Sequence, residues 1–487
     1  MNENAAYERG AVLVDGRWTP TATRTEVFNP ATAAVIGTAA SSTAADVDRA
    51  ATAARTAGTR WARTTPGQRA KYLRSLHALL RERRDQLVQV IVAEVGAPVT
   101  VARSAHVDLA LDILASFAEL AEGWDDERIG NSLVIRQAAG VVAAITPWNY
   151  PLYQLMAKVA PALAAGCSVI VKPAELTPLS AYLLADAIVD AEFPPRVVNL
   201  LPGSGSAVGA ALVTHPMVNV VSFTGSTQVG RQVGAAAGTA LKRVSLELGG
   251  KSASLVLPGA DLVAAVRATV ESAAFNSGQT CSASTRLIVP VAAYADALAV
   301  AEARALELVV GDPTLDRTDL GPLLSAEQRV RVHGFVERAV ADGARVRTGG
   351  TVPEGAGHFY PPTVIADADP HAEIAQEEVF GPVLTVLSYE GDTDEAVRMA
   401  NDSRYGLAGA VWGPDTESAL AAARRLHTGQ VDVNGAPFNV RAPFGGWKAS
   451  GIGRELGRQG LEEFCETTAI QLPIPMEESC PVRPATR

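Results

Sequence analysis

The feature that most constrains the fold of this 487-residue chain is a regular alternation of strand-like and helix-like segments between residues 141 and 247. Short runs rich in Val and Ile are separated by longer segments whose apolar residues recur at helical spacing. This alternation predicts a parallel sheet with helices on both faces, in which ligands bind beyond the carboxyl ends of the strands. The predicted strands are residues 141–145, 168–171, 197–200, 218–223 and 243–247.

Polar residues and glycines follow these predicted strands at the points where the strands end. Carboxyl ends of parallel strands meet at one edge of a sheet, so we expect the residues there to share one site. They are Asn149 after the first strand, Lys172 and Glu175 after the second, Gly225 and Ser226 after the fourth, and Glu247, which closes the fifth.

The length of the chain predicts about three folded units, because a single core rarely serves so many residues. Residues 45–121 carry long stretches of helical apolar spacing, which predicts a helical scaffold. A second α/β alternation begins near residue 254 and closes near residue 448. Two strand-like segments, 129–136 and 467–472, have no obvious partner in either α/β unit. We expect 467–472 to pair with a neighbouring subunit, since an open strand edge invites another chain.

Cys281 lies in the stretch Phe275-Asn-Ser-Gly-Gln-Thr-Cys-Ser-Ala-Ser-Thr-Arg286, between a predicted helix ending near Asn276 and a predicted strand beginning at Arg286. Small and polar neighbours on a loop can expose a thiolate to a substrate, which indicates a nucleophile. The alternative is that Cys281 is a small buried apolar residue, the commoner fate of an isolated intracellular cysteine.

Charge and cysteine usage exclude several classes of protein. The formal net charge of −10 leaves no basic face for nucleic acid. The N-terminus lacks the pattern of a secretory leader, and no apolar run is long enough to span a membrane, so we expect a cytoplasmic protein. The chain has no C-x-x-C pair and its seven histidines are scattered, which predicts neither a disulfide framework nor a metal site. The cysteines are Cys167, Cys281, Cys465 and Cys480.

The glycines that follow two of the strands indicate a dinucleotide rather than ATP. Gly225 to Gly230 comes after a strand and opens a helix, so free N–H groups can bind a diphosphate there. The fingerprint G-x-G-x-x-G is absent. Gly249-Gly-Lys-Ser252 imitates the end of a P-loop, but Ser245 stands where the first glycine is required, which excludes that ATP site.

Taken together, the motifs resemble the aldehyde dehydrogenase superfamily from about residue 11 to about residue 470. They are Pro147-Trp-Asn-Tyr-Pro151, Lys172-Pro-Ala-Glu175, Phe223-Thr-Gly-Ser-Thr-Gln-Val-Gly230, Glu247-Leu-Gly-Gly-Lys251, the Cys281 stretch and Glu377-Glu-Val-Phe-Gly-Pro382. The resemblance implies an α/β fold with a Rossmann-like dinucleotide-binding domain, an α/β catalytic domain and a small β flap for oligomerisation. The implied boundaries are 1–124 and 139–248 for the NAD-binding domain with its N-terminal helices, 249–448 for the catalytic domain, and 125–138 and 461–487 for the oligomerisation segment and tail.

The resemblance also implies how the cofactor is held. Lys172 and Glu175 match residues on the adenosine ribose, where a carboxylate repels a 2′-phosphate and so favours NAD over NADP. Glu378 matches the residue on the nicotinamide ribose, Phe380 packs near the nicotinamide ring, and Trp148 lines the same cleft. The remaining cofactor residues are expected to be Gly225, Ser226 and Gly230.

Aldehyde oxidation by this route needs a nucleophile, an oxyanion site and a base. Cys281 would add as a thiolate to give a thiohemiacetal, and its ordinary pKa near 8.5 leads us to expect local activation. The Asn149 amide and the Cys281 backbone N–H would bind the oxyanion, and Glu247 would activate water to hydrolyse the thioester. Lys158 matches a residue near the proton-exit path in the family, or else lies on the surface.

Substrate selection is expected from a tunnel that leads to Cys281. Ala157 replaces a bulky aromatic residue of many relatives, which suggests a wider tunnel for an aromatic or branched aldehyde. Arg441 either pairs with a substrate carboxylate, as in semialdehyde oxidation, or is a cation at a subunit interface. The implied tunnel residues are Tyr150, Tyr153, Gln154, Ala157, Phe438, Arg441 and Phe444.

The sequence therefore predicts an NAD-dependent aldehyde dehydrogenase that yields a carboxylate, with a small-molecule aldehyde as its partner and a homodimer or homotetramer as its assembly. One alternative is a CoA-acylating semialdehyde dehydrogenase, a branch that usually lacks the glutamate matched by Glu247. The other is a catalytically silent NAD-binding or structural homologue, against which the joint presence of Cys281, Glu247, Asn149 and Glu378 argues.

Overall fold

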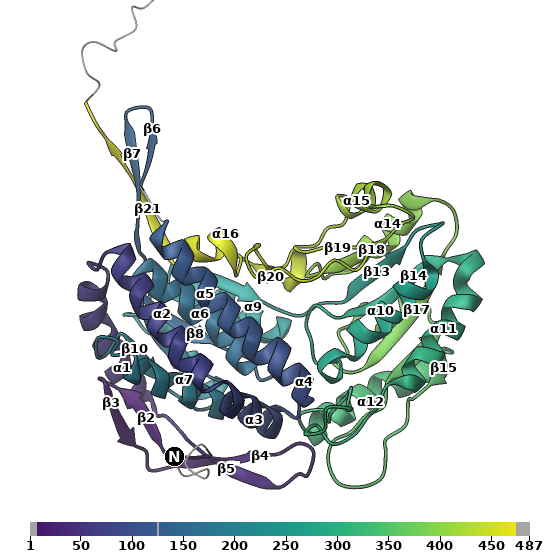
Figure 1. Cartoon of the computed structure of the whole chain (residues 1–487), viewed down its shortest axis with the longest axis horizontal. Coiled ribbons are helices and arrows are strands. Elements are labelled where there is room, and N and C mark those ends of the chain that lie inside the picture. Colours follow the sequence, from purple (N-terminus) through teal and green to yellow (C-terminus); the bar gives the residue numbers. More distant parts are fainter. Residues whose placement is uncertain (1–6, 124–125, 474–487) are drawn as a thin grey trace, which may run out of the picture.

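The computed structural model describes residues 7–123 and 126–473 of the chain. Two α/β lobes lie side by side, and each is built on one large sheet (Figure 1). This confirms the predicted α/β class. The division of the chain into units at residues 124, 139, 248 and 448 stays a prediction, and the expected tail beyond residue 473 lies outside the described residues.

The first sheet has eight strands, and its five central strands are parallel in the order β12-β11-β8-β9-β10. From β8 the chain adds β9 and β10 on one side of this strand, and later adds β11 and β12 on its other side. The switch point of the sheet therefore lies between β8 and β11. The strands in spatial order are β20 (Gly451–Ile452), β12 (Arg243–Glu247), β11 (Val220–Thr224), β8 (Val141–Ile145), β9 (Ser168–Lys172), β10 (Val198–Leu200), β2 (Ala11–Val14) and β3 (Arg17–Pro20).

Strand β8 shows why this sheet must lie inside the lobe. Val142 and Ala144 enter one apolar core, while Val141, Ala143 and Ile145 enter another, so both faces of the strand are buried. One core is closed by α2 (Pro66–Glu82), α3 (Arg84–Val95), α5 (Leu109–Glu122), α6 (Pro151–Ala165) and α7 (Leu179–Asp190). The other is closed by α1 (Ala44–Trp61), α8 (Ala210–Thr214) and α9 (Thr227–Thr239).

The second sheet has seven strands and supports the other lobe. Helices α10 (Leu262–Ala274) and α11 (Tyr294–Glu307) share one core with it, α14 (Thr393–Asn401) and α15 (Thr416–Ala423) another, and α12 (Ala326–Ala341) a third. The spatial order is β15 (Arg345–Thr348), β16 (Thr363–Ala366), β17 (Val383–Tyr389), β14 (Ser284–Pro290), β13 (Ser252–Val256), β18 (Gly409–Trp412) and β19 (Asp432–Val433).

The two large sheets contribute opposite ends of their strands to one region. Asn149 and Glu247 stand at the carboxyl ends of β8 and β12, whereas Cys281 precedes β14 and Glu378 precedes β17. The motif residues of the first sheet therefore lie at or after the carboxyl ends of its strands, whereas those of the second sheet lie before the amino ends of its strands. This arrangement brings the motifs of both lobes together although they are far apart in the chain.

The expected subunit-pairing strand has a partner within its own chain. Strand β21 (Cys465–Gln471) pairs antiparallel with β7 (Ser132–Ala138), which forms a hairpin with β6 (Glu127–Ile129). The two segments expected to lack a partner in either α/β unit thus pair with each other over seven aligned residues, and the pairing of 467–472 with a neighbouring subunit stays a prediction. The hairpin projects beyond the helices of the first lobe (Figure 1). No helix of residues 7–123 and 126–473 has the length and apolar character to cross a membrane.

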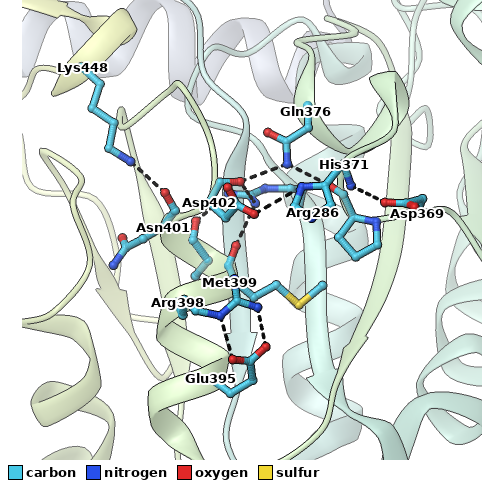
Figure 2. A network of polar contacts seen from close by, with 12 residues as sticks. Arg286, Asp369, His371, Gln376, Glu395, Arg398, Met399, Asn401, Asp402 and Lys448 are labelled. Atoms are coloured by element: carbon cyan, nitrogen blue, oxygen red, sulfur yellow. Dashed lines mark hydrogen bonds and ion pairs between the residues drawn. The ribbon is translucent and has the colours of Figure 1, made fainter.

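Arg286 on β14 fastens α14 to the second sheet (Figure 2). Its guanidinium is buried and donates to the carbonyl oxygens of Met399 at 3.2 Å and Ala400 at 2.7 Å. These carbonyls belong to the last turn of α14, where a helix leaves acceptors without internal partners. Burial lowers the pKa of Arg286 to about 10, so the side chain stays cationic at neutral pH.

Replacing Arg286 with Met should therefore lower the free energy of unfolding by about 3 kcal/mol, because buried carbonyl groups lose a charged donor. The midpoint of denaturant unfolding measures this loss. Arg398→Met is the matched control, since Arg398 is exposed and pairs only with Glu395 one helical turn away. Equal midpoints for the two variants would contradict the anchoring role of Arg286.

Candidate active site

The loop before Cys281 contains three successive residues in the left-handed region. Asn276, Ser277 and Gly278 have φ values of 52°, 58° and 73°. A Cβ atom at residue 278 would lie 2.1 Å from the carbonyl carbon of Gly381, so only glycine fits there. Non-glycine residues in this region are sparsely populated and persist where surrounding contacts hold them, often at functional sites. The turn carries the chain from α10 to the start of β14 and leaves Cys281 between them.

Side-chain amides hold this loop against the end of β8. Asn276 donates from Nδ2 to the carbonyl oxygen of Asn149 at 3.0 Å, and Asn149 donates from Nδ2 to the carbonyl oxygen of Gln279 at 2.9 Å. The Gln279 side chain in turn accepts from the Leu324 backbone N–H at 2.8 Å. Asn149 thus donates one of its two amide hydrogens to the loop.

His106 supports the same loop from the helical scaffold and was not predicted from the sequence. Its Nε2 lies 3.3 Å from Asn276 Oδ1, and its ring stacks on Tyr150 with centroids 4.4 Å apart. Burial lowers the pKa of His106 to about 3, so the ring is neutral and must carry its proton on Nε2 to donate to Asn276. The residue lies in a π-helical stretch, Ala102–Asp108, and no motif marked it.

Cys281 lies on the walls of two cavities, which we name the strand-end cavity and the aromatic cavity. The strand-end cavity has a volume of about 220 Å³ and collects residues that follow the strands of the first sheet. The cofactor and catalytic residues predicted from the sequence that line it are Trp148, Asn149, Gly225, Ser226, Cys281, Glu378 and Phe380. Gln154, Thr224, Leu248, Gly249, Gln328 and Arg331 also line it.

Three predicted cofactor residues do not line the strand-end cavity. Lys172 is buried and donates to the carbonyl oxygens of Pro173 at 2.7 Å and Gly203 at 3.0 Å, while Glu175 is exposed nearby. Burial lowers the pKa of Lys172 to about 8. Gly230 faces the protein: a Cβ there would lie 2.3 Å from Leu248 Cδ2, so this glycine packs α9 against the end of β12.

Glu378 reaches the cavity because Gly249 leaves room for its carboxylate. The Gly250 backbone N–H donates to Glu378 Oε1 at 2.9 Å, and a Cβ at residue 249 would lie 2.5 Å from Glu378 Oε2. Burial raises the pKa of Glu378 to about 7, opposed by the Arg331 and Lys251 cations. Beside it, the rings of Trp148 and Phe380 meet edge to face with centroids 5.2 Å apart.

Glu247 is not among the residues that line the strand-end cavity or the aromatic cavity. It is buried at the end of β12, and neither carboxylate oxygen has a hydrogen-bond partner. A Cβ at residue 445 would lie 2.6 Å from Oε1, so Gly445 makes room for this carboxylate. Burial, and then the Glu455 carboxylate, raise the pKa of Glu247 well above its usual range.

Lys158 is fully buried, so the alternative of a surface lysine was wrong. It forms an ion pair with Glu455 and donates to Thr224 Oγ1 at 2.7 Å. The positive charge of Lys158 opposes the rise in the pKa of Glu247. The same cluster therefore contains one cation and two carboxyl groups, close behind the cysteine loop.

The expected activation of the Cys281 thiol is absent from this arrangement. Burial raises the pKa of Cys281 far above its usual range, and the carboxylates of Glu378 and Glu247 raise it further. No cation is among the groups that shift this pKa. The thiol is therefore protonated at neutral pH in the described structure.

The aromatic cavity has a volume of about 410 Å³ and shares Gln154 and Cys281 with the strand-end cavity. Tyr150 is fixed there by a 2.7 Å hydrogen bond with Thr280. The predicted tunnel residues on its wall are Tyr150, Tyr153, Gln154, Phe438 and Phe444.

Two predicted tunnel residues are not on that wall. Ala157 is buried in the core of the first lobe, so its small side chain does not widen the aromatic cavity. Arg441 points to solvent and forms an ion pair with Glu119 at 2.6 Å. Its expected contact with a substrate carboxylate is therefore not made by this conformation.

Comparisons with known proteins agree on one family. Residues 18–470 match the Aldehyde dehydrogenase family. A 3-succinoylsemialdehyde-pyridine dehydrogenase of a Pseudomonas species is 44% identical over 464 residues, covering 94% of this chain and 97% of the relative. A geranial dehydrogenase of Castellaniella defragrans is 40% identical over 472 residues, covering 95% and 98%. A cysteine-to-alanine mutant of aldehyde dehydrogenase C from Pseudomonas syringae, solved with NAD+ and octanal, superposes with a TM-score of 0.94 at 43% identity, covering 96% and 98%.

The electrostatics of Cys281 predict slow alkylation at neutral pH. The rate constant for iodoacetamide at Cys281 should keep rising above pH 9 instead of levelling near the ordinary thiol pKa of about 8.5, because a raised pKa delays formation of the thiolate. Peptide mass analysis separates Cys281 from Cys167, whose pKa burial raises to about 11.

Glu378→Gln removes a neighbouring negative charge and should speed alkylation at pH 8 severalfold. Glu377→Gln is the matched control, because its carboxylate pairs with Arg404 and is not among the groups that shift the pKa of Cys281. A plateau below pH 8 in the wild-type protein would contradict this description of the thiol.

Proposed function

The chain belongs to the aldehyde dehydrogenase family, and on that premise we propose that Cys281, Asn149 and Glu247 carry out the oxidation of an aldehyde to a carboxylate with NAD. The observation that carries this proposal is the position of Cys281 on the walls of both cavities. A thiol placed there can meet an aldehyde from the aromatic cavity and a cofactor from the strand-end cavity.

The residues of the strand-end cavity suit the nicotinamide and diphosphate part of a dinucleotide. Ser226 is the N-cap of α9 and its side chain accepts from the Val229 N–H, which leaves the N–H groups of Thr227 and Gln228 in the first turn to bind a diphosphate beside Gly225. Gly249 leaves room for the Glu378 carboxylate, and the Gly250 N–H binds it, at the position expected for the nicotinamide ribose. We assign Trp148 and Phe380 to the nicotinamide end, and Lys172 and Glu175 to the adenosine ribose beyond β9. Gly230 serves by packing the helix.

The first chemical step is addition of the Cys281 sulfur to the aldehyde carbon. The thiol gives its proton to a water molecule, the thiolate sulfur forms a C–S bond, and the electron pair of the carbonyl π bond moves to oxygen. Asn149 donates its remaining amide hydrogen to this oxyanion, and the Cys281 backbone N–H is the second donor, each worth about 3 kcal/mol. Bound NAD supplies the acceptor for the hydride that the tetrahedral adduct then loses, which leaves a thioester on Cys281.

Hydrolysis of the thioester needs a base, and we assign this role to Glu247. Its carboxylate has no hydrogen bond that would hold it, so rotation of the side chain can bring it toward the thioester. Once ionised, it takes a proton from water as the water oxygen attacks the acyl carbon, and the Cys281 sulfur leaves. Lys158 and Arg454 favour the ionised form, and burial opposes it.

We also propose a homodimer or homotetramer. β21 lies at the edge of its sheet, with β7 on one side and no strand on the other among residues 7–123 and 126–473, so a second copy can pair there. We place the enzyme in the cytoplasm, since Cys167, Cys281 and Cys465 are all free thiols.

Cofactor preference is expected to depend on the charge of Glu175. The wild-type enzyme should have a higher kcat/KM with NAD than with NADP, and Glu175→Gln should shift this ratio toward NADP by about tenfold, because the repulsion of a 2′-phosphate is removed. Glu192→Gln, which removes an exposed carboxylate beyond α7, is the control. An unchanged ratio in Glu175→Gln would exclude Glu175 from the cofactor site.

Replacing Glu247 with Gln should separate the two halves of the reaction. Rapid mixing with NAD and an aldehyde should give up to one equivalent of NADH per site, followed by a steady-state rate lowered by at least about a hundredfold, because deacylation loses its base. Intact mass should show the acyl group on Cys281. Cys281→Ala should give neither burst nor adduct. A burst-free Glu247→Gln variant that still binds NAD would move Glu247 to the step before hydride transfer.

A further inference from the structure

The wall of the aromatic cavity carries carboxyl groups and no cationic side chain. Its apolar part comes mainly from aromatic residues, among them Phe275, Phe438 and Phe444. The two acidic residues on the wall are Glu271 and Asp432, and the only charged residues there are these two. The charge that a bound aldehyde meets in this cavity is therefore negative.

The charge of Glu271 is neutralised by a partner. Arg304 donates from Nε to Glu271 Oε1 at 2.9 Å, and the Glu271 side chain is half exposed to solvent. An exposed ion pair of this kind has little field beyond its own atoms. Glu271 therefore contributes little to the selection of a substrate.

Asp432 has no such cation. Its Oδ1 accepts a hydrogen bond from Gln430 Nε2 at 2.9 Å, and its Oδ2 receives none from the described residues. The backbone is held in place because Asp432 on β19 pairs with Ala410 on β18. Burial raises the pKa of Asp432, and the hydrogen bond from Gln430 opposes this rise. One carboxylate oxygen is thus fixed at the cavity wall as a free acceptor.

We infer that Asp432 makes the aromatic cavity select aldehydes with an apolar body and a cationic or hydrogen-bond-donating group at the end far from the aldehyde, and reject those that carry a carboxylate. This inference rests on the proposed function of the cavity as the substrate site. A donor on the substrate would satisfy Oδ2, and a charged donor would also offset the buried charge. A substrate carboxylate would find no cation on the wall, because Arg441 pairs with Glu119 outside the cavity.

Three aldehydes of similar shape test this inference. para-(Dimethylaminomethyl)benzaldehyde is cationic, para-isobutylbenzaldehyde is its neutral isostere, and para-formylphenylacetate is anionic. In the wild-type enzyme the cation should have a kcat/KM at least about tenfold above that of the anion, as one charged hydrogen bond allows. The neutral compound should lie between them.

Asp432→Asn keeps the shape of the side chain and removes its charge. The ratio of kcat/KM for cation over neutral compound should fall about tenfold, and the ratio for anion over neutral compound should rise. Ratios cancel any general loss from altered packing. Glu417→Gln removes a negative charge from the exposed start of α15, away from the cavity, and should leave both ratios unchanged.

Failure of this inference is distinguishable from failure of the proposed function. If the neutral aldehyde is oxidised while the wild-type enzyme uses the anion as well as the cation, Asp432 does not select the substrate. The same conclusion follows if Asp432→Asn leaves both ratios unchanged. If Cys281→Ala oxidises the neutral aldehyde as fast as the wild-type enzyme, the assignment of the reaction to this site falls first.

Discussion

The structure depends on how a strained turn is held between the two lobes. Asn276, Ser277 and Gly278 all occupy the left-handed region, and the free energy for this must come from contacts around them. Asn276 binds the main chain of Asn149 and faces His106, while the Gln279 side chain binds the chain beside α12. Because these amides bind main-chain atoms of both lobes, the position of Cys281 relative to the strand ends is set by buried hydrogen bonds rather than by the loop alone.

Burial also affects the ionisation of the Cys281 thiol and of the carboxyl groups around it. Glu247 and Glu378 lie close enough to Cys281 to disfavour its thiolate, and burial raises the pKa of all three groups. A change in the protonation of either carboxyl group therefore changes the pKa of the Cys281 thiol. The buried Lys158, which pairs with Glu455, lowers the pKa of Glu247, and the buried Lys251 lowers that of Glu378. A cofactor that brings positive charge into the strand-end cavity would favour the thiolate by ordinary Coulomb attraction.

Much of the fold followed from local pattern. The strands at 141–145 and 243–247 have the observed bounds, since apolar runs bounded by breakers predict buried parallel strands. The helix-strand context of Cys281 was also predictable. His106 was not, because a buried histidine in a helix carries no periodic signal. Nor were the true positions of Ala157 and Arg441, since a motif places a residue near a site without showing which way its side chain points. The role of Gly230 depends on Leu248, a contact between separate elements.

The end of the chain returns to its beginning. β20 pairs with β12, and β21 pairs with β7, although the whole second sheet lies between them in the sequence. During synthesis on the ribosome, the edges of β12 and β7 therefore lack these partner strands until the second lobe has been synthesised. Domains of a growing chain generally fold in order from the N-terminus, and open edges are prone to wrong pairing. This protein completes its first lobe last, and a chain that ended before residue 451 would lack both strands that close these edges.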